Sequence, residues 1–223
     1  MEKGEIINRV YLILGSGRNN CNIFAIEGKE TILVDCGIPE VYENLIKNMK
    51  SFGLPFPSFI LITHCHFDHA LAGYLFEKSG SKIVAHEKTA EALEKETYKI
   101  WPENVSAVKK TKVEIKFKED KVIEIGGIKI NLIHTPGHTA GSSSFLIEIE
   151  GKKCLFTGDL ILEGGKIGWK GSIDFNIEEI EKSLKKIKNL EFDLLLPGHG
   201  RWFKKKEGIE FIEKALKNIK NPL

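Results

Sequence analysis

The 223-residue sequence predicts an α/β fold of four layers, in which two β-sheets pack face to face and helices cover both outer faces. Two observations support this prediction. Short runs rich in β-branched residues alternate with longer stretches that carry apolar residues at helical spacing. The order of strands followed by helices also occurs twice, over roughly residues 1–110 and 111–223, with no linker or low-complexity stretch between them. We therefore expect one domain, residues 1–223, made of two similar halves.

The first half begins with strands and ends with helices. Glu27-Gly28-Lys29-Glu30 is the expected turn of an early hairpin. Apolar residues recur at helical spacing from Leu45 to Phe52, and Gly53 is the expected stop of that helix. The predicted strands are 5–14, 22–27, 31–35, 59–63 and 82–85, and the predicted helices are 41–52, 71–78 and 89 to about 99.

The second half repeats this order from Lys112 onward. Two stripes of isoleucine and leucine at helical spacing, Ile177 to Ile187 and Ile209 to Ile219, predict its helices. The predicted strands are 112–117, 121–125, 128–133, 144–150, 153–157 and 193–196.

The composition excludes several classes of protein. With 42% hydrophobic and 29% charged residues the chain can bury a core, which excludes a disordered or collagen-like protein. The 33 basic and 31 acidic side chains nearly cancel, so no global field attracts nucleic acid or an anionic membrane. No apolar run approaches the ~20 residues of a membrane span, and the first residues lack an apolar signal core. We therefore expect a cytoplasmic protein.

Two further features concern the compartment and the source. The four cysteines show no CxxC spacing, which predicts reduced, mostly buried thiols and not a disulfide framework. Glutamine is absent, and lysine, glutamate and isoleucine are abundant. This bias is typical of hyperthermophile proteins and also of AT-rich genomes, and we expect a thermophilic source.

A histidine-rich segment follows one of the predicted buried strands. Residues 63–69 read THCHFDH. In an extended stretch His64 and His66 face the same side, and where the chain turns into a helix Asp68 and His69 can reach a neighbouring point. The pattern HxHxDH arises by chance in only about two of ten thousand chains of this length. The segment therefore predicts a site that could hold two metal ions.

Three more candidate ligands lie where predicted strands end. They are His138 in TPGHT, Asp159 in TGD and His199 in PGHG, and a glycine precedes each. Glycine permits tight turns, which let an imidazole or a carboxylate reach inward from a loop. For any one of these residues alone, a place in a turn or in the core would be the preferred explanation. Five of the seven histidines and two of the six aspartates lie at such turns, however, and together they favour a metal site.

From Asp35-Cys36-Gly37 through HCHFDH, TPGHTAGS and TGD to LPGHG, the sequence resembles the metallo-β-lactamase-fold hydrolases, and most of all their glyoxalase II branch. The resemblance implies an αββα sandwich of two mixed sheets, and it implies that Asp35 orients a ligand histidine. It does not imply a glutathione thioester, because only about 25 residues follow His199, where glyoxalase II has an added helical domain. It implies one metal on His64, His66 and His138, a second on Asp68, His69 and His199, and Asp159 as the bridge.

The chemistry of these ligands also indicates the metal and the reaction, independently of the resemblance. Imidazoles with carboxylates suit Zn²⁺, Fe²⁺ or Mn²⁺, and zinc is the first expectation. Two cations lower the pKa of a shared water toward ~7. We therefore expect a dinuclear hydrolase in which metal-bound hydroxide cleaves a small thioester, ester, lactone or amide, with Asp68 and Asp159 as catalytic ligands. Its expected partner is a small-molecule substrate, with neither nucleic acid nor membrane involved.

Other functions compete with this one. Persulfide dioxygenases resemble the pattern too, and bind one Fe²⁺ through two histidines and an aspartate, here matching His64, His138 and Asp159. A mononuclear iron oxidoreductase is therefore the alternative. Flavodiiron proteins are disfavoured because they have a carboxylate where His66 stands. A metal-binding scaffold without activity is disfavoured by the complete ligand set.

Aromatic residues outside these motifs suggest where substrate binds. The glycine-rich segment 163–175 carries Trp169 and Phe175 just beyond the TGD motif, and both are expected to wall the pocket; the alternative is packing on the core. Tyr98 and Trp101 form either a lid or part of the core.

Four features receive a structural interpretation. Cys65 points away from its histidine neighbours in an extended segment, so we expect a buried thiol. His86 and His134 match no family ligand, and we expect core or rim histidines, with a substrate contact as the alternative. The lysines at 204–206 are expected to be solvated and not to bind phosphate.

Overall fold

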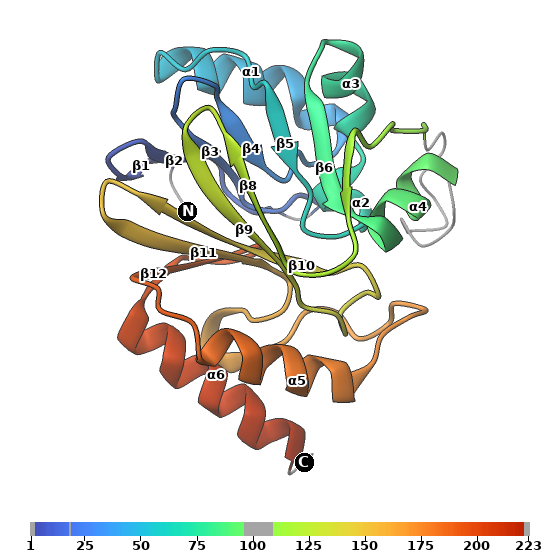
Figure 1. Ribbon diagram of the computed structural model, residues 1–223, viewed down its shortest axis with the longest axis vertical. Helices are drawn as coiled ribbons and strands as arrows, with labels where there is room; N and C mark the ends of the chain where they lie inside the picture. The colour runs from blue at the N-terminus through green and yellow to red at the C-terminus, as the bar shows by residue number, and fades with distance from the viewer. Residues whose placement is uncertain (1–2, 18, 96–108, 221–223) are drawn as a thin grey trace.

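Two β-sheets packed face to face form the centre of the structure, and helices cover both outer faces (Figure 1). This computed structural model describes residues 3–17, 19–95 and 109–220. The four-layer αββα sandwich that the sequence predicts is confirmed.

The first sheet has seven strands and is mixed. Its first four strands are joined antiparallel, and the fourth to the seventh run parallel. The single strand predicted at 5–14 is wrong: this stretch is a hairpin, because the chain reverses at Arg9, whose φ is +69°. In sheet order the strands are β1 (Gly4–Ile7), β2 (Val10–Leu14), β3 (Ile23–Ile26), β4 (Ile32–Val34), β5 (Phe59–Leu61), β6 (Lys82–His86) and β7 (Ile115–Phe117).

The second sheet has six strands and is also mixed. The stretch 112–117, predicted to begin the second half, supplies β7 of the first sheet instead, because it pairs in parallel with β6. The two sheets thus separate between Phe117 and Lys121, and not near residue 110. In reverse sheet order the strands are β8 (Lys121–Ile125), β9 (Ile128–His134), β10 (Ser143–Ile149), β11 (Lys152–Gly158), β12 (Leu194–Pro197) and β13 (Phe203–Lys204).

The helices agree well with the periodic stretches of the sequence. Helix α5 begins after Asn176, whose side chain accepts hydrogen bonds from the backbone N–H groups of Glu178 and Glu179. None of the described helices has the length and apolar composition needed to span a membrane. The helices are η1 (Pro39–Val41), α1 (Tyr42–Ser51), α2 (Phe67–Ala70), α3 (Gly73–Lys78), α4 (Glu87–Lys95), η3 (Glu163–Gly165), α5 (Ile177–Lys188) and α6 (Lys205–Lys220).

Alternation along the strands builds three apolar layers. Leu33 of β4 faces α1 and α3, whereas its neighbour Val34 faces the other sheet. Leu155 of β11 likewise faces α5 and α6, while Phe156 lies between the sheets with its ring centroid 5.4 Å from that of Phe24. All four cysteines are buried and none forms a disulfide, as expected.

The functional edge of the sandwich lies where the parallel strands end. Asp35 follows β4 and His64 follows β5 in the first sheet, and Asp159 follows β11 and His199 follows β12 in the second. The carboxyl ends of parallel strands are the usual position of ligand sites in α/β proteins.

Candidate metal centre

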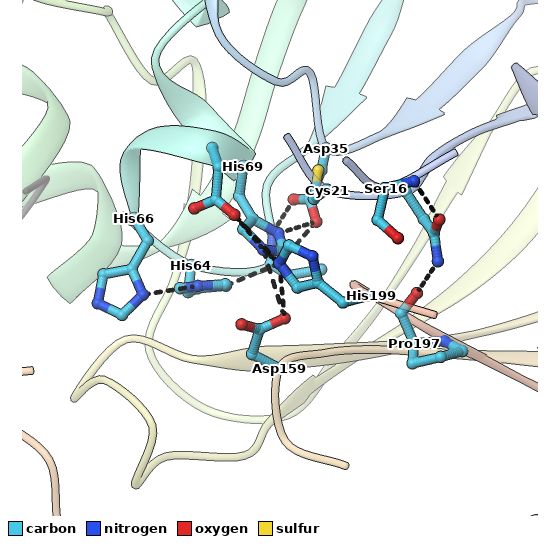
Figure 2. A network of polar contacts seen from close by, with 12 residues as sticks. Ser16, Cys21, Asp35, His64, His66, His69, Asp159, Pro197 and His199 are labelled. Atoms are coloured by element: carbon cyan, nitrogen blue, oxygen red, sulfur yellow. Dashed lines mark hydrogen bonds and ion pairs between the residues drawn. The ribbon is translucent and has the colours of Figure 1, made fainter. Parts of the chain in front are cut away.

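Seven side chains singled out by the sequence meet at this edge. They come from the segment that joins β5 to α2, from α2 itself, and from the loops that follow β9, β11 and β12. Figure 2 shows His64, His66, His69, Asp159 and His199 around a common centre. The whole set forms overlapping groups of possible metal donors, namely His64, His66, Asp68, His69, His138, Asp159 and His199.

Three imidazole nitrogens form the first group. The Nε2 atom of His138 lies 3.2 Å from Nε2 of His64 and 2.9 Å from Nδ1 of His66, and these last two atoms are 3.1 Å apart. In a tetrahedral zinc site with Zn–N bonds of about 2.0–2.1 Å, the nitrogens lie about 3.3 Å from one another. This triangle therefore has the size that one transition-metal ion requires.

The second group contains a carboxylate and two imidazoles. Oδ2 of Asp68 lies 3.1 Å from Nε2 of His199 and 3.7 Å from Nε2 of His69, and the two imidazole nitrogens are 3.3 Å apart. The sequence places Asp68 and His69 side by side, whereas His199 arrives from the other sheet. This arrangement is a second set of three donors.

Asp159 lies between the two groups. Its Oδ1 is 3.4 Å from Nε2 of His69, and its Oδ2 is 3.6 Å from Nε2 of His138. The Oδ1 atom is buried and makes no hydrogen bond within the described chain. A buried carboxylate oxygen without a hydrogen bond is costly unless a cation compensates it. The residues therefore fit metal ions at both groups.

Burial keeps the imidazoles of the first group neutral. It lowers the pKa of His66 to about 3 and the pKa of His64 well below its ordinary value, and the neighbouring imidazoles act in the same direction. Burial also lowers the pKa of His138, although the carboxylate of Asp159 opposes this. Neutral imidazole is the form that binds metal.

The carboxylates of the site are ionised. Burial alone would raise the pKa of Asp159, but the imidazoles of His69, His199 and His138 outweigh burial and hold that pKa far below its ordinary value. The pKa of Asp68 is lowered in the same way by His69 and His199 against the effect of burial. Without a metal, Cys21 and the surrounding carboxylates raise the pKa of His69 against the effect of burial.

Asp35 is held directly behind His69. Its Oδ2 accepts a 2.7 Å hydrogen bond from Nδ1 of His69, so that Nε2 of that imidazole is turned to the site. The same carboxylate accepts hydrogen bonds from the backbone N–H and the hydroxyl of Thr63, each of 2.8 Å. Cys21 lies beside this pair, and burial raises the pKa of its thiol to about 12.

The glycines before the ligands leave no room for a side chain. A Cβ at Gly198 would lie 2.6 Å from Cε1 of His69, and one at Gly158 would lie 2.8 Å from the hydroxyl oxygen of Thr63. Gly137 has a φ of +127° and its Cβ would collide with Ile180 of α5. The glycines thus let these loops approach closely.

The side chains that fix the loop of His199 were not among the residues singled out from the sequence. Nδ2 of Asn22 donates hydrogen bonds to the carbonyls of Pro197 at 3.0 Å and Gly200 at 2.8 Å, and Oδ1 of Asn22 accepts one from the N–H of Ser16. The hydroxyl of Ser16 in turn accepts the N–H of Gly200. No motif in the sequence marks these contacts, which join distant segments.

A second missed set of contacts supports His66. Its Nε2 lies 3.4 Å from the hydroxyl oxygen of Ser172, and that hydroxyl donates to Oδ1 of Asp174 at 2.8 Å. The other oxygen of Asp174 accepts the N–H of Ala140, two residues beyond His138. Loop 168–174 therefore connects two of the candidate ligands.

The two aromatic residues of this loop differ. Trp169 is 48% exposed and its ring centroid is 5.9 Å from that of His66, next to the site. Phe175 does not line the site as expected; it packs on the core beneath α5 and α6, which removes its ring from the edge of the sandwich. Tyr98 and Trp101, the expected lid or core residues, lie outside the described residues.

The remaining histidines stay apart from the seven donors. The rings of His86 and His134 stack with centroids 3.9 Å apart, and their Nε2 atoms lie 3.0 Å from the carbonyl oxygens of Lys118 and Ala140, respectively. Cys65 is buried in the core beneath the helices of the first sheet. At 204–206, all three lysines are exposed.

Comparisons with known proteins agree with this geometry. Residues 16–199 match the family model described as the metallo-beta-lactamase superfamily. A probable metallo-hydrolase of Methanocaldococcus jannaschii is 29% identical over 80% of this chain and 87% of its own length. An acyl-coenzyme A thioesterase of Homo sapiens is 24% identical over 83% of this chain and 75% of its own length.

Two further comparisons concern the branch and the fold. The hydroxyacylglutathione hydrolase GloC of Haemophilus influenzae is 28% identical over 83% of this chain and 87% of its own length, in keeping with the likeness to glyoxalase II. A subclass B3 metallo-beta-lactamase of Bradyrhizobium japonicum has the same fold, with a TM-score of 0.81 at 20% identity over 99% of this chain and 92% of that one. The chain therefore belongs to the metallo-β-lactamase superfamily and is a metal-dependent hydrolase of that superfamily.

Proposed function

We propose that the chain is a dinuclear hydrolase that cleaves a small acyl compound, a thioester before an ester, lactone or amide. The proposal assigns His64, His66 and His138 to one metal ion, Asp68, His69 and His199 to a second, and Asp159 to both. Zn²⁺ is the proposed ion, because imidazole and carboxylate donors suit it and the spacing of the first group matches its bond lengths.

One observation carries the proposal. The two oxygens of Asp159 face different groups of donors, and Oδ1 has no hydrogen bond although it is buried. A carboxylate so placed is expected to bridge two cations. Two bound cations would activate water at neutral pH and polarise the acyl carbonyl.

The side chains themselves perform two tasks. Buried, neutral His64, His66 and His138 present nitrogen donors without first losing a proton. Asp159 and Asp68 supply the negative charge that balances the cations. Among the described residues each of the seven donors is assigned to a metal, and Asp35 and Cys21 lie behind His69, so none is left over to protonate a leaving group.

The lack of a side chain that could protonate the leaving group favours a thioester as substrate. A thiol has a pKa near 8.5 and leaves readily as a thiolate, whereas an alkoxide or an amide nitrogen needs a proton donor. The relatives named as an acyl-coenzyme A thioesterase and a hydroxyacylglutathione hydrolase also support cleavage of an acyl group from a thiol. They differ in the thiol, which is coenzyme A in one name and glutathione in the other.

The test combines metal content with product release. Protein purified without chelator and supplied with Zn²⁺ should bind close to two equivalents per chain by elemental analysis and should release thiol from a short acyl thioester. A limit of one equivalent would refute the two-metal assignment, and absence of hydrolysis with every acyl compound tested would refute the function.

A variant of the bridging residue sharpens this test. Asp159→Ala should fall below two metal ions per chain and lose nearly all turnover, because two cations without a bridging carboxylate repel each other. Asp120→Ala is the matched control, since its carboxylate is half-exposed and pairs with Lys186 on the surface. Retained turnover in Asp159→Ala would remove that residue from the site.

A further inference from the structure

Exposed apolar side chains are concentrated in the segment that begins at Trp169, beside the candidate metal centre. In the described part of the chain, five large apolar side chains are exposed, and three of them belong to residues 169–177. These are Trp169, Ile173 and Ile177, with exposed fractions of 48%, 68% and 37%. A local apolar patch on the rim of an active site is typical of a surface that binds substrate.

A groove lies on the other side of the same loop. It has a volume of about 520 Å³ and is enclosed by η3 and the residues after it, the start of α5 and the second half of α6. Ile167, Ile177, Ala215 and Ile219 give it an apolar lining. Ile177 belongs both to the exposed patch and to the groove, so the two surfaces are continuous.

One segment of chain both lines the groove and approaches the metal centre. The N–H of Gly168 donates a 2.9 Å hydrogen bond to the carbonyl of Asp159, and a Cβ at Gly168 would lie 2.9 Å from Cε1 of His138. The flanking residues Ile167 and Lys170 line the groove. A ligand in the groove can therefore extend over the loop to the metal centre.

Three lysines converge on this groove without a counter-charge. Within the described chain, the ammonium groups of Lys166, Lys170 and Lys214 form neither an ion pair nor a side-chain hydrogen bond. The contrast with α5 is clear, because all four of its lysines are paired, namely Lys182, Lys185, Lys186 and Lys188.

Two acidic side chains next to groove residues in the sequence are paired elsewhere, whereas Glu178, next to the groove residue Ile177, is exposed and forms no ion pair with any described residue. Glu163, next to the groove residue Gly164, pairs with Arg201, and Glu213, next to Lys214, pairs with Lys188. Like charges gathered in one concavity repel one another unless an anion binds between them. The groove is therefore complementary to a ligand with several negative charges.

We propose that this groove binds the phosphorylated nucleotide end of coenzyme A, so that the substrates are acyl-coenzyme A thioesters. The inference rests on the proposed thioester hydrolysis and decides between the two thiols. Coenzyme A combines phosphates for the lysines, an adenine ring for the apolar lining, and a long neutral arm that crosses the loop to the metal centre. Glutathione has neither phosphate nor a flat apolar ring.

Binding is tested first, without turnover. Adenosine 3′,5′-bisphosphate, which carries the charges of this nucleotide but no thiol, should bind the zinc-loaded full chain with saturation in calorimetry. Binding should weaken at least tenfold in the triple variant Lys166→Gln, Lys170→Gln, Lys214→Gln and should weaken with added salt. The control Lys47→Gln, Lys50→Gln changes exposed lysines of α1 and should bind as the unmodified protein does.

Turnover then connects the groove to the reaction. The kcat/KM for hexanoyl-coenzyme A should exceed that for hexanoyl-pantetheine, which lacks the nucleotide, by at least tenfold. This ratio should fall toward one in the triple lysine variant and stay unchanged in the α1 control. A variant that folds poorly or binds less metal loses kcat/KM for both substrates by the same factor. The ratio of the two kcat/KM values therefore isolates the contribution of the nucleotide.

The outcomes separate the two proposals. Hydrolysis of both thioesters with equal kcat/KM, together with no binding of the bisphosphate, would overturn the groove assignment and leave the hydrolase standing. Hydrolysis of neither thioester would overturn the proposed function and, with it, the assignment of coenzyme A as substrate. A preference for the acyl group on an acidic carrier protein, lost in the triple variant, would make the groove a protein-docking surface and overturn the nucleotide assignment.

Discussion

Nδ1 of His69 donates a 2.7 Å hydrogen bond to Oδ2 of Asp35, and both side chains are almost closed to solvent. This bond keeps a proton on Nδ1, so that Nε2 is the nitrogen turned toward His199 and Asp159. The backbone of Asp35 has a φ of +60°, which is unfavourable for a residue with a Cβ. This backbone conformation places the carboxylate of Asp35 where it can reach His69 and Thr63 at the same time.

Asp35→Asn should therefore weaken metal binding. All three groups facing the carboxylate are hydrogen-bond donors, and an amide would direct its own N–H₂ group at some of them. We expect metal affinity to fall about 10–100-fold, measured by competition with a chromophoric chelator. Asp193→Asn is the control, because its carboxylate accepts the N–H of Lys153 at 2.8 Å far from the site. Equal affinity in the two variants would contradict this role of Asp35.

Asn22→Ala should release the loop that carries His199. The substitution removes the hydrogen bonds to the carbonyls of Pro197 and Gly200 and should lower the free energy of unfolding by about 1–3 kcal/mol. Zinc content should fall toward one equivalent. Asn48→Ala is matched, since Asn48 is also buried and donates to the carbonyl of Ile13 away from the site. If both variants lose stability equally and both keep two zinc ions, Asn22 has only a structural role.

Trp169→Ala should change substrate binding and leave metal content intact. The ring is half-exposed and lies beside His66, so it is placed to contact the acyl compound. We expect KM to rise several-fold, or the preference among acyl chains to change. Unchanged kinetics with a lowered melting temperature would show instead that the ring serves packing.

The His86–His134 stack predicts a pH-dependent stability. Burial, aided by His134, lowers the pKa of His86 from 6.5 to about 4. Between these values the unfolded chain binds the proton and the folded chain does not, so the free energy of unfolding falls as the pH drops from 6.5 toward 4. The loss is on the order of 1–2 kcal/mol.

The comparison uses His86→Gln and the unmodified protein, both stripped of metal and unfolded with denaturant at pH 7 and pH 4.5. The variant lacks the titrating group, so its deficit in stability should be largest at pH 7 and should shrink at pH 4.5. An equal deficit at both pH values would mean that His86 does not titrate as described.

Local spacing made the first half of the site predictable from sequence. His64, His66, Asp68 and His69 lie within six residues, and the strand before them and the helix after them determine where they point. The glycines before His138, Asp159 and His199 identified the other loops because each loop needs a residue without a side chain. The residues named from the resemblance are brought together by the structure.

Contacts between distant segments were not predictable in the same way. Asn22 reaches a carbonyl 175 residues away, and Ser172 reaches His66 across 106 residues. No spacing rule connects such pairs, and polar residues in loops look alike in sequence. The same holds for β7, whose sheet depends on its non-local pairing with β6, and for Phe175, whose direction depends on how its loop folds onto the core.

The central claim is that this site catalyses hydrolysis with two metal ions and consumes water, not oxygen. The most direct measurement is turnover of a short acyl thioester by apoprotein reconstituted with Zn²⁺ alone under anaerobic conditions, with the iron form and glutathione persulfide assayed in parallel at an oxygen electrode. Zinc cannot change oxidation state, so the zinc form should release thiol and acid without oxygen. Activity confined to the iron form, with stoichiometric oxygen uptake on the persulfide, would contradict the hydrolase and indicate an iron oxygenase.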